Sequence, residues 1–293
     1  MTIDTSPLSH VAPAPRRRWP RRVARLHDEM LGVSLLAGPA NVIMELAQPG
    51  VGHGVLESRV ESGRVDRHPI KRARTTFTYV AVALRGTDAQ RAAMRRAVNG
   101  VHAQVYSTAE SPLAYNAFDK DLQLWVGACI YKGTIDVQRI FVGELDDETA
   151  DRHYADGMNL CTTLQVPPEM WPADRAAFDE YWRDSLTKVH IDDTVREYLY
   201  PIAVNRVRGV KLPRSLQRAS ENFALLITTG FLPQKFRDEM RLPWSPQHQR
   251  RFDGLMSVIR TVNGVLPRFV REFPFNLMVR DLDWRIRTGR PLV

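Results

Sequence analysis

Residues 87–106 read TDAQRAAMRRAVNGVHAQVY and carry the strongest helical pattern in the chain. Thr87 or Asp88 is a suitable helix N-cap, and apolar residues then recur every three or four positions. They form two adjoining rows, one of Ala93, Ala97, Val101 and Val105 and one of Met94, Val98 and His102. The segment is therefore predicted to be an amphipathic helix with His102 on its buried side.

The rest of the chain after about Arg21 has the same helical periodicity and few alternating, strand-like runs. Ser245 followed by Pro246 is a typical helix start, and Gly86, Gly143 and Gly230 are suitable helix ends. The further helices are predicted at Asp119–Val142, Asp147–Leu164, Asp174–Lys188, Asp192–Tyr200, Leu216–Gly230 and Pro246–Glu272. We expect an all-α fold with one domain over residues 20–293, after a flexible, Pro- and Arg-rich tail at residues 1–19.

The composition excludes several classes of protein. With 293 residues, 44% hydrophobic and 25% charged, the chain is neither disordered nor collagen-like. Its longest charge-free stretch, Leu31–Met44, is shorter than the roughly 20 apolar residues that cross a bilayer, so no membrane span is expected. Cys129 and Cys161 lie in apolar stretches, which favours buried thiols and a cytoplasmic location.

The net charge is 41 − 33 = +8, but it does not indicate a nucleic-acid partner. Part of the excess lies in an Arg-rich segment, residues 16–25, and the remaining basic residues are dispersed. No zinc-finger spacing or aromatic stacking motif accompanies them. We therefore expect no nucleic-acid binding.

The sequence lacks a Gly-rich phosphate loop, a nucleophile elbow, a His-Glu-x-x-His motif and cysteine pairs at metal spacing. Two features remain. His102, on an apolar helix face, is either a hydrogen-bonded core residue or a haem ligand in a dry pocket. Arg72 and Thr76 lie one helical turn apart, either on a solvated surface or at the edge of that pocket.

Together, several short segments resemble one known family. Arg72 to Thr76, with Gly86-Thr87 beyond, is similar to its Arg-Leu-Arg-x-Thr element and the Gly-Thr after it, and Val101-His102-Ala103 to its histidine helix. The other matching segments are Ala47-Gln48-Pro49, Gly54-Val55 with Glu57, Tyr115 to Asp119, Trp125-Val126 and Leu232-Pro233 with Arg237. The family is the DUF2236 group of latex-clearing rubber oxygenases and MpaB-type oxygenases.

The resemblance implies a globin-like helical core around haem b, with His102 as the proximal iron ligand. It places Arg72, Thr75 and Thr76 at the haem, and Thr75 stands where the rubber oxygenases have a lysine. Because a threonine hydroxyl is a poor iron ligand, we expect five-coordinate or water-bound iron. A register one residue earlier, pairing Lys71 with Thr75, is possible, but Arg72 with Thr76 keeps arginine at the arginine position.

The implied activity is a haem-dependent oxygenase that uses O₂ at a carbon–carbon double bond of a hydrophobic, isoprenoid or lipid-like substrate. The expected catalytic residues are Glu57, Arg72 and Thr76. Glu57 matches the family's proposed base, and if it is desolvated its pKa should be raised toward neutrality. Tyr115 and Trp125 are expected to pack without taking part in the chemistry.

Two alternatives remain open. The chain could be a haem protein without oxygenase activity, or a non-catalytic helical module that binds a ligand or a partner. Residues 252–293, which carry Phe269, Phe273, Phe275 and Trp284, are a candidate lid or partner surface. The electron donor and the oligomeric state are not indicated by any motif.

Overall fold

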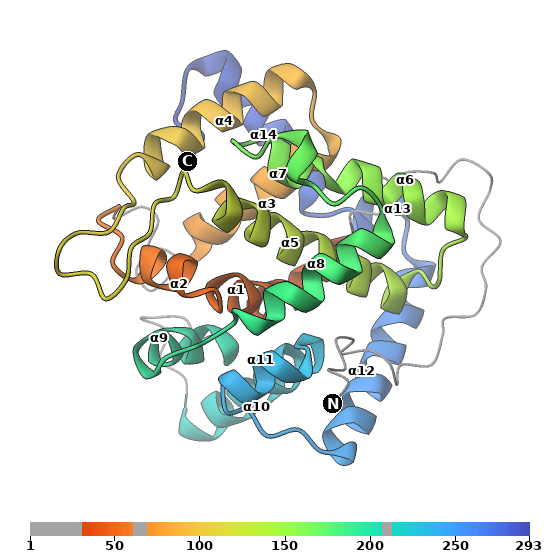
Figure 1. The fold of residues 1–293 in the computed structure, drawn as a ribbon. Coiled ribbons are helices and arrows are strands. Elements are labelled where there is room, and N and C mark those ends of the chain that lie inside the picture. Colours follow the sequence, from red (N-terminus) through yellow and green to blue (C-terminus); the bar gives the residue numbers. More distant parts are fainter. Residues whose placement is uncertain (1–30, 61–68, 207–212) are drawn as a thin grey trace.

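The structure is a computed structural model and describes residues 31–60, 69–206 and 213–293. In these ranges every regular element is a helix, apart from one isolated antiparallel bridge between Tyr106 and Asn116 (Figure 1). The all-α class is confirmed, and the tail predicted at residues 1–19 lies outside the described residues. The elements are 3-10 helices η2 (Gly32–Ala37) and η4 (Pro168–Met170), and α-helices α1 (Gly38–Leu46), α2 (Pro49–Leu56), α3 (Pro69–Arg85), α4 (Asp88–His102), α5 (Lys120–Phe141), α6 (Asp147–Gly157), α7 (Asn159–Thr162), α8 (Arg175–Thr187), α9 (Asp193–Ala203), α10 (Arg214–Phe231), α11 (Gln234–Glu239), α12 (Pro246–Val265), α13 (Arg268–Arg271) and α14 (Phe275–Thr288).

The helix starts follow from side chains that cap the first turn. Thr87 accepts a hydrogen bond from the Gln90 backbone N–H, and the Gln90 side chain accepts one from the Thr87 N–H, which completes a capping box at α4. The predicted start of this helix is confirmed. Side-chain caps also begin α5, α6, α8, α9 and α12, at Asp119, Asp146, Asp174, Asp192 and Ser245.

Three predicted helices end earlier than expected. The helix expected to reach Tyr106 ends at His102, because Val105 and Ala117 pair by a backbone hydrogen bond of 2.9 Å instead. The helix predicted at 147–164 divides into α6 and α7 beside Gly157, where a side chain would collide with the Tyr131 ring. The segment predicted at 246–272 stops at Val265, before Pro267.

Helix α5 lies at the centre of the fold and packs against α1, α7 and α12 (Figure 1). It can approach α7 and α1 closely because Gly127 faces the Cys161 side chain and Gly133 faces the Asn41 side chain, with no room for a Cβ at either position. One cluster of buried apolar side chains joins α5 to elements from Leu31 to Phe275. Cys129 and Cys161 are both free and buried within this cluster, so the prediction of buried thiols is confirmed.

The C-terminal helices pack on the outside of this core. Helix α14 lies along α3, where Arg74 Nη1 is 3.3 Å from Asp281 Oδ2. Arg85 Nη2 is 3.1 Å from Glu272 Oε1, just before α14. Helix α3, which carries the predicted Arg–Thr element, is thus supported by α14 along its length.

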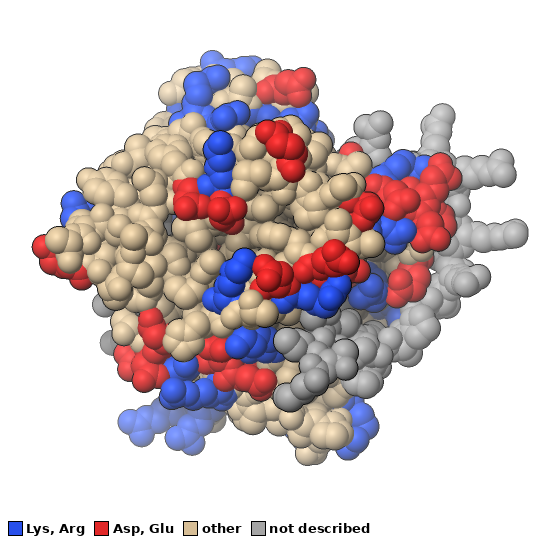
Figure 2. Space-filling model, viewed as in Figure 1, with Lys and Arg blue, Asp and Glu red and all other residues tan. Residues whose placement is uncertain are grey.

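On the face shown in Figure 2, basic and acidic side chains alternate in small groups rather than forming one large patch of a single sign. None of the described helices is both long and apolar enough to cross a lipid bilayer.

Candidate active site

A cavity lies where α1 to α5 meet; we call it the His102 cavity. It has a volume of about 210 Å³ within a wider hollow of about 1250 Å³ that includes space open to solvent. A few polar side chains converge in an apolar wall, which is the usual character of a small-molecule site. The apolar lining includes Val51, Val55, Val98, Val101, Leu122, Val126, Ile130, Leu160 and Leu164, and the polar lining includes Glu45, Arg72, Thr75, Thr76, His102 and Gln123.

One face of α3 contributes four of the lining residues: Arg72, Thr75, Thr76 and Tyr79. Their spacing of three, four and seven residues places them on one side of a helix. Thr75 Oγ1 donates a hydrogen bond of 3.0 Å to the Lys71 carbonyl oxygen. Arg72 has no hydrogen-bonded or ion-paired partner in the part of the chain that the structure describes, so its guanidinium is available to an anionic group in the cavity.

His102 is the last residue of α4, and its ring lines the cavity. Its Nδ1 is buried and has no hydrogen-bond partner among the described residues, while Phe118 packs edge-on against the ring at 6.2 Å between centroids. Burial, and secondarily the charge of Arg72, lowers the pKa of His102 to about 4. The imidazole is therefore neutral at neutral pH and keeps a lone pair for a ligand. His102 is half-buried and lies on the predicted side of α4, with its Nδ1 enclosed.

A chain of amide hydrogen bonds supports the last turn of α4 behind His102. Gln165 Nε2 donates to Asn99 Oδ1 at 2.6 Å, and Gln123 Nε2 donates to Gln165 Oε1 at 2.6 Å. Because Gln123 belongs to the central helix α5, this chain holds the turn that carries His102 against the core.

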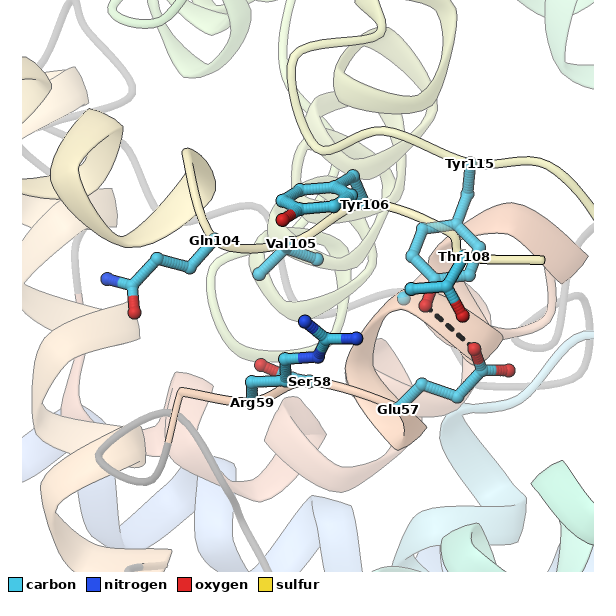
Figure 3. A pocket seen from close by; sticks show the side chains of 9 residues that line it. Glu57, Ser58, Arg59, Gln104, Val105, Tyr106, Thr108 and Tyr115 are labelled. Carbon is cyan, nitrogen blue, oxygen red and sulfur yellow. Dashed lines mark hydrogen bonds between the residues drawn. The ribbon is translucent and has the colours of Figure 1, made fainter. Parts of the chain in front are cut away.

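The structure places Glu57 outside the His102 cavity. Glu57 lines a smaller pocket of about 90 Å³ together with Arg59, Tyr106 and Thr108 (Figure 3). The pocket contains one end of a hydrogen-bonded group that we call the Glu57 cluster, made up of Glu57, His53, Asp192, Ser111 and Tyr115.

Every polar side chain of the Glu57 cluster has a partner within it. Ser111 Oγ and Tyr115 Oη donate to Glu57 Oε2 at 2.6 and 2.8 Å. His53 Nδ1 is 3.2 Å from Glu57 Oε1, and His53 Nε2 is 2.7 Å from Asp192 Oδ2. Partial burial acts to raise the pKa of Glu57, but the hydrogen bonds from Ser111, Tyr115 and His53 outweigh it, and the pKa is lowered. A raised pKa was expected only if Glu57 were desolvated, and the partly exposed carboxyl does not meet that condition.

The carboxylate in the wall of the His102 cavity is instead Glu45, which the sequence reasoning missed. Burial raises the pKa of Glu45 to about 7, although the charge of Arg72 and a hydrogen bond from Asn41 act in the opposite direction. Asn41 Nδ2 donates to Glu45 Oε1 at 2.6 Å. One signal was available, because Glu45 is the only Asp, Glu, Lys or Arg between Leu31 and Leu56.

Trp125 and Tyr115 make hydrogen bonds and ring contacts near this site. Trp125 Nε1 donates to the Glu45 backbone carbonyl oxygen at 3.0 Å, and its ring stacks on Trp182 with centroids 5.3 Å apart. Tyr115 lines both pockets and directs its hydroxyl to Glu57. Their expected packing role fits these contacts.

Two further histidines, His153 and His190, and the C-terminal segment all lie outside the lining of the His102 cavity. His153 is fully buried on α6, and His190 is exposed beside Glu239, so neither lines it. Residues 252–293 contribute no side chain to its lining. Helix α12 packs on α5 and α10, and α14 packs on α3, so the segment does not cover the cavity as the suggested lid would.

Comparisons with known proteins agree with the resemblance found in the motifs. Residues 21–261 match the family described as "ER-bound oxygenase mpaB/B'/Rubber oxygenase, catalytic domain". Uncharacterized proteins from Mycobacterium bovis and Mycobacterium tuberculosis are each 51% identical to the chain over 259 residues, which is 88% of this chain and 100% of the relative. No solved structure matches. Because the family match includes α1 to α11 and most of α12, the chain belongs to the family of mpaB-type and rubber oxygenase catalytic domains.

Proposed function

We propose that this protein is a haem b-dependent oxygenase that uses O₂ to oxidise or cleave a carbon–carbon double bond in a hydrophobic, isoprenoid or lipid-like substrate. Membership of an oxygenase family supports the reaction class. The observation that carries the rest is the neutral His102 imidazole, lining an apolar cavity with an unpartnered Nδ1.

The side chains of the cavity fit a haem. A porphyrin supplies four of its iron's ligands itself, so the protein needs only one axial donor, and His102 is a neutral imidazole. No group of three or more His, Cys, Asp or Glu side chains placed to hold a metal ion by themselves is found in the described ranges. The cavity itself, about 210 Å³, is smaller than the roughly 300–1000 Å³ that hold drug-sized ligands, so a haem would also have to occupy part of the wider hollow that opens to solvent.

We assign the holding of the cofactor to His102, Arg72, Thr75 and Thr76. His102 is the proposed iron ligand, and Arg72 is a guanidinium without a described partner that suits a propionate carboxylate. Haem, when bound, supplies an iron centre at which O₂ can react. Thr75 already donates its hydroxyl proton to the Lys71 carbonyl, which favours a packing role rather than that of an iron ligand. We propose that the side chain of Thr76, one helical turn after Arg72, helps to hold the Arg72 guanidinium in position.

The apolar wall supports a hydrophobic substrate. The lining includes Val51, Val55, Val98 and Val101 together with several leucines and Ile130. These side chains offer no hydrogen bonds, so the wall favours a hydrocarbon ligand and excludes water. An isoprenoid or lipid chain presents such a surface and contains the double bonds on which this reaction acts. The cytoplasmic location expected from the sequence stays a prediction.

The test is an absorption spectrum of freshly purified full-length protein expressed with a haem precursor. A Soret band is expected in the wild type, and its loss is expected in His102→Ala. His190→Ala is the matched control, because this histidine is exposed and outside the cavity, and it should keep the band. A colourless wild type that also fails to change the spectrum of added haemin would contradict the proposal and favour a non-catalytic ligand-binding module.

Haem binding and oxygenase activity are separated by a second measurement. The haem-loaded protein is incubated with a polyisoprenoid under oxygen, and products are identified by mass spectrometry after labelling with ¹⁸O₂. Label in the product supports an oxygenase. A clear Soret band without labelled product from any isoprenoid or unsaturated lipid offered favours a haem protein of another activity.

A further inference from the structure

The His102 cavity contains one carboxylate among the residues that the structure describes, and it belongs to Glu45. Glu45 is in the last turn of α1 and shares the cavity wall with Arg72 of α3 and His102 of α4. Glu57, the acidic residue that the family pattern points to, lies in another pocket with both oxygens engaged. The Glu45 carboxyl therefore lines the cavity with one side-chain hydrogen bond, whereas the Glu57 carboxylate is held by three such bonds outside it.

From this placement we propose that Glu45 is the proton-exchanging group of the His102 cavity, able to give its proton to an oxygen atom of a bound ligand. The use of that proton in an oxygenase reaction rests on the function proposed above. That Glu45 exchanges a proton does not rest on the proposed function, because this part of the inference concerns only side chains of the protein itself.

The surroundings of Glu45 raise its pKa, and its side chain still lines a cavity that opens to solvent. Burial disfavours the charged carboxylate and raises its pKa to about 7. The charged or titratable groups around it are the Arg72 guanidinium from α3, the Cys129 thiol from α5 and, in the same cavity wall, the His102 imidazole and the phenols of Tyr79 and Tyr115. Both phenols donate their protons elsewhere, to the Leu160 carbonyl and to Glu57. His102 and Cys129 are neutral at this pH, because burial lowers the pKa of the first and raises that of the second.

The side-chain amide of Asn41 can form a hydrogen bond with either protonation state of Glu45. In the structure its amide Nδ2 donates to Glu45 Oε1 at 2.6 Å, which suits a carboxylate acceptor. Its Oδ1 is buried without a hydrogen-bond partner in the described residues. A half-turn of the amide would let Oδ1 accept from a protonated Glu45, since amide oxygen and nitrogen exchange places with little change in shape.

The proton transfer is simple to balance. The O–H bond of Glu45 breaks and a new O–H bond forms at an oxygen atom of the bound ligand. The electron pair of the broken bond stays on the carboxylate, and no oxidation or reduction takes place at Glu45. Arg72, one positive charge in the same wall, stabilises the carboxylate that is left. Water entering from the open side of the hollow returns the proton.

Difference infrared spectroscopy of the haem-free, full-length protein tests the inference directly. Between about pH 5 and about pH 9, a protonated-carboxyl C=O band should disappear with a midpoint near 7. In heavy water the band should shift, because an exchanging acid takes up deuterium. The band should be absent in Glu45→Gln and present in Glu57→Gln, whose carboxyl has a lowered pKa.

A second variant keeps the test decisive if Glu45→Gln folds poorly. Arg72→Gln removes the charge that lowers the Glu45 pKa, so the band should persist to a higher pH than in the wild type. Three results would each overturn the inference: no band that titrates near neutrality, a band that survives Glu45→Gln, or a band that does not shift in heavy water. Because these spectra need no haem, a missing Soret band would defeat the proposed function and leave this result standing.

Discussion

The His102 cavity and the Glu57 cluster each combine a histidine with a glutamate, but they satisfy these groups differently. Both ring nitrogens of His53 face a carboxylate oxygen, and Glu57 accepts from three side chains. In the cavity, His102 Nδ1 has no partner among the described residues, and neither has Oδ1 of Asn41, which bonds Glu45 from outside the lining. Because native proteins pair nearly all buried polar groups, unpartnered ones in a cavity wall point to a ligand, whereas a fully paired cluster is typical of structural support.

The largest expected effect is a difference between His102 and His53 in cofactor binding. His102→Ala should abolish the Soret band and change the Tm of the haem-free protein little, since its Nδ1 makes no hydrogen bond there. His53→Ala should do the reverse, keeping the band but lowering the Tm, because Glu57 and Asp192 each lose one of their partners. Absorption spectra and thermal melts of both variants measure this contrast, which would fail if both variants lost the band equally.

The second effect is a pH dependence of stability set by Glu45. Its folded pKa is about 7, above the ordinary 4.5, so between these values the unfolded chain binds fewer protons than the folded one. Stability should therefore fall as pH rises through this window, by about 3 kcal/mol for full burial of the carboxylate. Glu45→Gln should remove the fall, and urea unfolding at pH 5, near the lower end of this window, and at pH 8, about one unit above its upper end, compares the two proteins. A wild type equally stable at both pH values would argue against a protonated Glu45.

The third effect has the opposite sign and arises in the Glu57 cluster. The pKa values of Glu57 and Asp192 are lowered in the folded protein, so the unfolded chain binds more protons in acid. Their contribution is present above the ordinary carboxyl pKa and is lost as pH falls through the folded values. Glu57→Ala, which leaves Ser111, Tyr115 and His53 without their acceptor, should cost about 1–2 kcal/mol in urea unfolding near neutral pH. Little or no change would indicate that solvent replaces the carboxylate.

The smallest effect concerns the support of α3 by α14. Arg74→Ala removes an ion pair at 3.3 Å whose side chains are 29% and 38% exposed, so it should cost less than about 1 kcal/mol. The haem spectrum should be unchanged, because Arg74 does not line the cavity although Arg72 and Thr76 do. A weakened Soret band in Arg74→Ala would mean that the position of α3 depends on this contact. Arg74 would then count among the residues that position the haem site.

Much of the fold follows from local rules that the sequence displays. Thr87, Asp174 and Ser245 cap helices in the structure because a short polar side chain satisfies free backbone N–H groups wherever the helix lies. The helix ends were less predictable. The last turn after His102 is replaced by backbone pairing between Val105 and Ala117, and that pairing depends on a loop that returns from a distance.

The candidate site shows the same division. The sequence alone determined the face of α3 that presents Arg72, Thr75 and Thr76, and the buried side of α4 that presents His102, because helical periodicity is a local property. Only the tertiary structure decided that Glu57 is turned into a hydrogen-bonded cluster and that Glu45 lines the cavity. The protonation state of a carboxyl depends on its burial and on charges from other helices, and these are assembled only when α1, α3 and α5 pack together.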